Sequence, residues 1–148
     1  MSLEYLPSIK PSALAIGALY THASSFVVYG PLFGQIWHKA MQQDKSSEYR
    51  EREAGVAATT YVSSVAAAVV QSYAVGALIT VTGTLSYKGA AYLGGLLFCV
   101  NAAPSAVHSV FVEKRPLEYV LVKAAANILE TVGLSMVLVW WGPRTSPF

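Results

Sequence analysis

Four long apolar stretches limit the folds that this chain can adopt. They cover about residues 11–34, 55–83, 89–112 and 117–141. Each is close to the roughly 20 residues that a helix needs to cross a bilayer. Within lipid, a chain can satisfy its backbone hydrogen bonds only in helices or in a closed barrel. The stretches therefore predict an all-α integral membrane protein with four transmembrane helices.

Composition supports a single domain that lies in a lipid bilayer. Of the 148 residues, 54% are hydrophobic and 12% are charged, whereas soluble domains carry about 25% charged residues. The formal net charge is only +2, and no basic run is interleaved with aromatic residues. This pattern argues against nucleic-acid binding. We expect one membrane domain spanning residues 1–148.

The links between the stretches predict how the helices connect. The longest link, residues 38–53, is polar, and Ser46 or Ser47 ahead of its acidic residues is typical of a helix N-cap. The other two links are short, and Pro116 suits the start of the last helix. Short links favour antiparallel neighbours, so an up-down-up-down bundle is predicted.

The distribution of basic residues predicts the orientation in the membrane. One side carries most of them: Lys39, Lys45, Arg50, Arg52, Lys114 and Arg115. The other side carries Lys10, Lys88 and Arg144. Because Lys and Arg favour cytoplasmic loops, the polar loop 38–53 is expected in the cytoplasm and both termini on the opposite side. We expect a multi-pass protein of the endoplasmic reticulum or plasma membrane.

A carboxylate near the middle of the last apolar stretch needs an explanation. Glu130 lies well inside residues 117–141, where an ionised side chain costs about 2.5–3.5 kcal/mol on insertion scales. Its short side chain cannot reach the interface, so we expect it to be protonated, paired with His or Lys, or facing water. Asn127 and Lys123 share its helix face, although Lys123 can also snorkel to the interface.

Polar residues also recur at helical spacing on the other three stretches. They are Asn101, Ser105 and His108; Tyr61, Ser64 and Gln71; and His22, Ser25 and Tyr29. Lipid cannot hydrogen-bond these groups, so the stripes are expected to converge inside the bundle. Pro104 lies within the third stretch and predicts a bend that opens space there.

These stripes supply candidate site residues. Imidazole and carboxyl groups can exchange protons, which makes Glu130, His108 and His22 the candidate catalytic residues. The candidate substrate-binding residues are Asn127, Asn101, Tyr29, Gln71, Tyr61 and Lys123. The serine hydroxyls are interpreted as packing residues, and the amides fit interhelical hydrogen bonds equally well.

Motifs for metal or cofactor binding are not found. No H-x-x-x-H or E-x-x-H spacing occurs on any one predicted helix. Glycine-rich phosphate loops and nucleophile elbows are also lacking. We therefore expect neither a metal nor a cofactor.

Two segments resemble a known family. Residues 27–41, VVYGPLFGQIWHKAM, contain Tyr29, Gly30, Pro31, Leu32, Phe33, Gly34 and Trp37. Residues 111–130, FVEKRPLEYVLVKAAANILE, contain a Phe-x-x-x-Arg-Pro pattern. Both resemble the domain of unknown function 1761 family, which implies a small four-helix membrane fold but no reaction. Asn127 stands where that family's last helix usually has a histidine, so proton chemistry of that histidine does not carry over to this chain.

Three functions fit these observations. The first is a cofactor-free enzyme of the isomerase or cyclase type that acts on a lipophilic small molecule through Glu130 and His108. The second is a proton-linked transporter, and a homodimer suits this function because four helices rarely enclose a pathway. The third is a structural or scaffolding subunit in which the polar stripes only join helices. A polar cavity around Glu130 favours the first function, and a filled interior favours the third.

Overall fold

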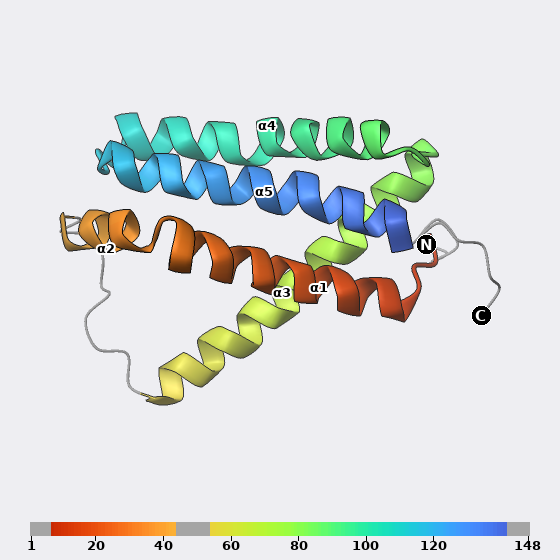
Figure 1. The fold of residues 1–148 in the computed structure, drawn as a ribbon, viewed down its shortest axis with the longest axis horizontal. Helices are drawn as coiled ribbons and strands as arrows, with labels where there is room; N and C mark the ends of the chain where they lie inside the picture. Colours follow the sequence, from red (N-terminus) through yellow and green to blue (C-terminus); the bar gives the residue numbers. More distant parts are fainter. Residues whose placement is uncertain (1–6, 44–53, 142–148) are drawn as a thin grey trace.

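A computed structural model describes residues 7–43 and 54–141, and all regular secondary structure within these ranges is helical (Figure 1). The elements are α1 (Pro11–Val27), η2 (Val28–Leu32), α2 (Gly34–Gln43), α3 (Ala54–Thr82), α4 (Tyr87–Phe111) and α5 (Leu117–Trp141). The predicted N-cap at Ser46 or Ser47 lies outside the described residues. Several of the basic residues used for orientation also lie there, so orientation and compartment stay predictions.

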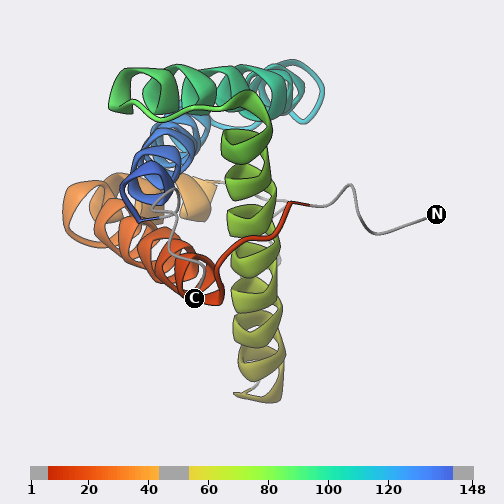
Figure 2. The same cartoon turned by 90° about the vertical axis from the view of Figure 1, so that its right-hand side faces the viewer.

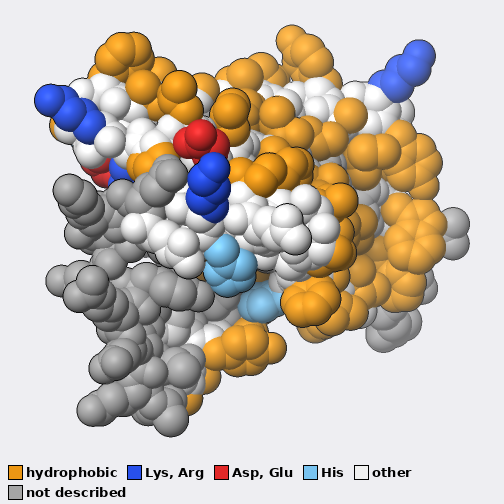
Figure 3. Space-filling model, turned by 60° about the vertical axis from the view of Figure 1, so that its left-hand side comes forward, with side chains coloured by type: hydrophobic (Ala, Val, Ile, Leu, Met, Phe, Trp, Pro, Cys, Tyr) orange, Lys and Arg blue, Asp and Glu red, His pale blue; other side chains and the backbone are white. Residues whose placement is uncertain are grey.

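Four helical segments are long and apolar enough to cross a membrane. They are Pro11–Leu32, Ala58–Thr82, Tyr87–Phe111 and Leu117–Trp141. This confirms the predicted fold class of four transmembrane helices. Figure 3 shows hydrophobic side chains over the top and right of one face, with His and several charged side chains toward its left and centre. The apolar part of this surface is suited to contact lipid.

The helices do not form a regular bundle. α4 and α5 lie side by side in opposite directions, and α1 packs against both α3 and α5 (Figure 1). α3 crosses α1 and α5 obliquely, and it stands upright in Figure 2. Gly17 of α1 lies against Ser72 of α3, so close that a Cβ on the glycine would be 2.8 Å from the Ser72 Cβ. Because α3 crosses its neighbours obliquely, the predicted regular antiparallel arrangement is not confirmed.

The largest buried cluster lies where the helices meet. It consists of Ala13, Val75, Ile79, Ala90, Leu134, Leu138 and Val139. Two fully buried serines form hydrogen bonds within their own helices. The Ser72 hydroxyl donates to the Ala68 carbonyl at 2.7 Å, and the Ser135 hydroxyl donates to the Thr131 carbonyl at 2.8 Å. Small hydroxyl side chains therefore let these helices approach without leaving a polar group unpaired.

The first membrane segment ends differently from the prediction. After α1, the chain widens into the π-helix η2, where the Phe33 amide donates to the Val28 carbonyl at 3.0 Å. Pro31 lies in this turn, and proline has no amide hydrogen that would need an acceptor there. By contrast, α4 continues through Pro104 without interruption. Proline therefore interrupts the regular α-helix in the first segment rather than in the third.

A short helix follows where a loop was predicted. The polar loop was expected from residue 38, but α2 extends over Gly34–Gln43. Ala40 is buried in a cluster with Tyr119 and Val120, and Trp37 packs against the same cluster. These contacts with α5 hold a helix in a segment that the sequence marked only as polar, so the predicted loop boundary was wrong.

Candidate functional site

An open groove lies between α3, α4 and α5. Its volume is about 710 Å³, which is within the range of about 300–1,000 Å³ for small-molecule sites. Its polar lining consists of Gln71, Asn101, Ser105, Lys123, Asn127, Glu130 and Thr131. Its apolar lining consists of Ala67, Val70, Ala74 and Ala102. We call this the central groove.

The central groove brings together five of the predicted site residues. Lys123, Asn127 and Glu130 come from α5, Gln71 comes from α3, and Asn101 comes from α4. Their spacing within each helix had placed them on common faces, and the packing turns those faces toward the same space. The polar stripes of three helices therefore meet at one place.

Glu130 is half-buried and has polar neighbours from two other helices. The Gln71 side chain hydrogen-bonds its carboxyl group, and His22 of α1 lies close enough to interact with its charge. Tyr20 of α1 and Tyr29 of η2 also interact electrostatically with Glu130. A carboxyl group at this depth therefore has the polar surroundings that a membrane interior does not supply.

His22 of α1 faces α3, and one of its hydrogen bonds places a hydrogen on Nδ1. Nδ1 lies 2.9 Å from the Ala18 carbonyl oxygen, which can only accept, so Nδ1 carries a hydrogen. Nε2 lies 3.3 Å from Ser64 Oγ. The Tyr61 ring lies 5.9 Å from the imidazole, but Tyr61 is 66% exposed and is not part of the groove lining. His22 and Tyr61 therefore form a neighbouring cluster.

The structure does not bring His108 to Glu130. The His108 side chain is 60% exposed, and its Nδ1 lies 3.4 Å from Glu113 Oε1 at the end of α4. It is seven residues beyond Asn101, which moves it about 10 Å along the helix. The helical spacing predicted that His108 shares a face of α4 with Asn101. This face extends beyond the end of the groove, and His108 lies on the part outside it.

The turn between α4 and α5 holds an ion pair that can be tested by titration. Arg115 Nε donates to Glu113 Oε2, and this hydrogen bond lowers the pKa of the Glu113 carboxyl below its ordinary value of 4.5. The pair is therefore intact at neutral pH and is lost as the pH falls through the lowered pKa. Arg115→Gln is expected to raise the pKa of Glu113, measured by NMR titration of labelled glutamate. Lys114→Gln serves as the control, and equal pKa values in both variants would contradict the assignment.

An aromatic cluster beside the central groove was not predicted as a unit. The Tyr29 and Trp37 ring centroids lie 4.6 Å apart, and Trp37 stacks on Tyr119 at 5.2 Å. The Arg115 guanidinium carbon lies 5.1 Å from the Tyr119 ring centroid, and Lys123 Nζ lies 5.6 Å from it. The cluster joins the two segments that carry the family resemblance. Tyr119 precedes Lys123 by four residues, so i, i+4 spacing is the signal that could have revealed it.

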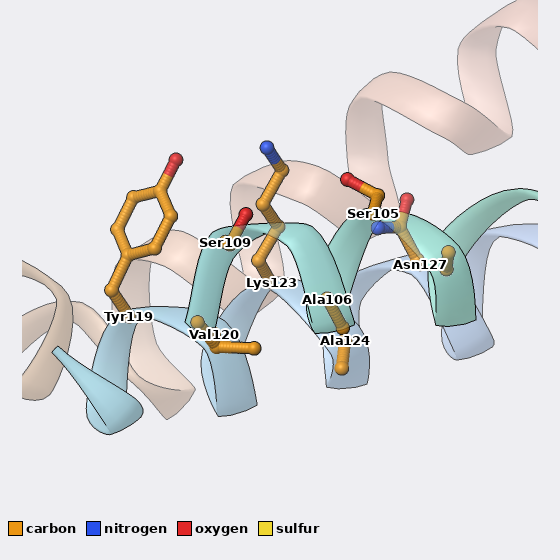
Figure 4. Close-up of a pocket in the computed structure, with 9 residues that line it drawn as sticks. Ser105, Ala106, Ser109, Tyr119, Val120, Lys123, Ala124 and Asn127 are labelled. Atoms are coloured by element: carbon orange, nitrogen blue, oxygen red, sulfur yellow. The ribbon is translucent and has the colours of Figure 1, made fainter. Parts of the chain in front are cut away.

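A second, very small pocket adjoins the groove between α4 and α5 (Figure 4). Its volume is about 10 Å³, which is about the space that a single water occupies. Ser105, Lys123 and Asn127 line both this pocket and the central groove. In Figure 4 the polar ends of these three side chains and of Tyr119 point to the same side. The cationic and hydrogen-bonding groups are thus presented together.

Residues 7–43 and 54–141 contain no evident metal-binding site. Within these ranges, no group of three or more His, Cys, Asp or Glu side chains is placed to hold a metal ion. Glu130 has a histidine as its neighbour and a hydrogen bond from the Gln71 amide, and two phenols lie within electrostatic range. The donor set around Glu130 is therefore suited to hydrogen bonding.

Comparison with known proteins identifies the family. Residues 12–139 match the family described as "Protein of unknown function (DUF1761)". The chain is 41% identical over 147 residues to a UPF0591 membrane protein of Schizosaccharomyces pombe, and the match covers 97% of each chain. No solved structure matches the chain. With its four membrane-spanning helices, the chain is an integral membrane protein that belongs to the DUF1761 family.

Proposed function

We propose that this protein binds a lipophilic small molecule in the central groove and acts on it as a cofactor-free isomerase or cyclase. The observation that carries the proposal is the convergence of polar side chains from α3, α4 and α5 on one groove. Opposite the polar residues of α5, α3 contributes Ala67, Val70 and Ala74. A groove that sets polar side chains against an apolar wall fits a ligand with both polar atoms and an extended apolar part.

A purely structural role explains the groove less well. Polar residues that only join helices are expected to pair with one another across the contact. Asn101 is instead exposed on the groove wall. Only Gln71 and Glu130 pair across it among the groove residues of the described chain. Thr131 donates to the Asn127 carbonyl of its own helix, which leaves the side chains of Asn101, Ser105, Lys123 and Asn127 for a ligand.

In the proposed chemistry, Glu130 is both the proton donor and the proton acceptor. Isomerisation and cyclisation rearrange bonds within one molecule, so a proton added at one atom is balanced by a proton removed from another. Glu130 would donate and recover this proton, while Gln71 orients the carboxyl group and His22, Tyr20 and Tyr29 provide a polar environment. No oxidant, reductant or co-reactant is required. His108 has no part in this proposal because it lies at the end of α4.

A blocking substitution tests whether the groove is the site. Ala67→Trp places an indole on the groove wall without removing a polar group, whereas Ala66→Trp places one on an exposed position of α3 outside the groove lining. Membranes containing the wild type are expected to accumulate a lipophilic product of unchanged mass and altered chromatographic retention. Ala67→Trp should reduce this product at least tenfold and Ala66→Trp should leave it unchanged, measured by mass spectrometry of lipid extracts.

Two results would contradict the proposal. The first is an identical lipid profile with and without the wild-type protein in every membrane tried. The second is equal product formation by both tryptophan variants at equal abundance. If pH-driven flux into proteoliposomes replaced product formation, transport would become the better explanation of the same groove.

A further inference from the structure

We call the end of the central groove nearest the start of α5 its mouth, and Lys123 carries a positive charge there. It is six residues into α5 and therefore about 9 Å from the start of that helix. Its side chain is half-buried, and its ammonium lies over the Tyr119 ring, one turn nearer the helix start. The ion pairs of the described residues join His108 and Arg115 to Glu113, and none involves Lys123. No described carboxylate neutralises Lys123.

Glu130 does not supply the missing negative charge. It lies seven residues further along α5, which corresponds to about 10 Å along the helix axis. Its carboxyl group is already hydrogen-bonded by Gln71 and interacts with His22. The Tyr119 ring provides Lys123 with a cation–π contact, but this neutral ring leaves the positive charge in place. A lysine this close to a helix end can snorkel to the interface, but Lys123 also lines the groove, where a charged side chain marks a ligand or ion site.

The groups around Lys123 are suited to an acidic headgroup. Ser105 and Asn127 line the same part of the groove, and Figure 4 shows their polar ends pointing to the same side as the ammonium. Arg115 adds a second positive charge beside Tyr119, although it also binds Glu113. Ammonium, amide and hydroxyl donors together match the several acceptor oxygens of a carboxylate or phosphate.

We infer that the ligand of the central groove is an amphiphile with a carboxylate or phosphate headgroup, which Lys123 binds at the groove mouth. Its apolar tail extends past Asn127 along Val70 and Ala74 toward Glu130. This inference rests on the proposed function and adds a substrate class to it. It also places the reacting part of the molecule about 10 Å from the acidic headgroup, since Lys123 and Glu130 are two helical turns apart.

Three probes with the same tail test the headgroup directly. The full chain in a neutral detergent is titrated calorimetrically with oleate, oleyl phosphate or oleyl alcohol, and Ala67→Trp gives the background for binding outside the groove. The wild type is expected to bind at least one of the acids ten times more tightly than the alcohol. Lys123→Met should abolish this preference, whereas Lys123→Arg should keep it. Lys88→Met removes an exposed lysine of α4 and should change nothing.

The results separate this inference from the proposed function. The inference is overturned if the wild type binds the alcohol as tightly as both acids, or if Lys123→Met keeps the preference. In either case, binding that Ala67→Trp abolishes would still support a lipophilic ligand in the groove. Binding that is equal in the wild type and in Ala67→Trp would overturn both. A preference for only one of the acids would identify the headgroup as carboxylate or phosphate.

Discussion

Gly94→Ala is expected to separate α4 from α5 and to lower the free energy of unfolding by about 1–3 kcal/mol, the usual cost of overpacking. A Cβ at Gly94 would lie 2.6 Å from Val132 Cα and 2.7 Å from the Thr131 carbonyl oxygen. Both are backbone atoms, so no side-chain rotation can relieve the clash. α4 packs chiefly against α5, and other contacts cannot compensate. Denaturant unfolding in detergent, followed by circular dichroism, measures the loss.

The adjacent glycine provides a matched control. A Cβ at Gly95 would meet nothing within 4 Å, and alanine is favoured over glycine in a helix interior by about 1 kcal/mol. Gly95→Ala is therefore expected to be neutral or stabilising. Equal unfolding free energies for the two variants would show that α4 and α5 do not approach closely at Gly94. Because α4 contributes Asn101 and Ser105 to the groove, Gly94→Ala should also weaken ligand binding.

The sequence was sufficient to predict the number of helices that can cross a membrane and several residues of the groove. Apolar length alone determines how many segments can cross a bilayer, and this property does not depend on how the helices pack. Glu130, Asn127 and Lys123 were correctly placed on one face because helical geometry fixes the angles between them. A carboxyl group in an apolar helix also had to meet polar partners, whichever helices supplied them.

Other features depend on tertiary contacts that the sequence does not specify. The oblique course of α3 brings Gly17 and Ser72 into close contact, and these residues are more than fifty positions apart in the sequence. Tyr20 was missed because it lies in an apolar run, yet its hydroxyl donates to the Leu129 carbonyl of α5 at 3.0 Å. His108 was placed in the site for a different reason. Helical spacing shows on which face of a helix a residue lies, but it does not show how far the groove extends along that helix.

Glu130→Gln is expected to slow product formation by about 10²–10⁴-fold, the usual contribution of a general acid–base group. Glutamine has nearly the same shape as glutamate and can still hydrogen-bond Gln71, but it cannot release and recover a proton. The helices and the groove should therefore remain intact, and binding of the lipophilic molecule should persist. Initial rates of product accumulation in membranes with equal amounts of protein measure the effect.

Glu118→Gln removes an exposed carboxylate from the first turn of the same helix, outside the groove, and is expected to leave the rate unchanged. Bound lipophile in each purified variant is compared by native mass spectrometry. Loss of turnover with retained binding assigns Glu130 to the chemical step, because a group that only joined α5 to α3 would affect both together. Full turnover in Glu130→Gln would instead show that the carboxyl group carries no proton and that its hydrogen bond with Gln71 serves only to hold α5 against α3.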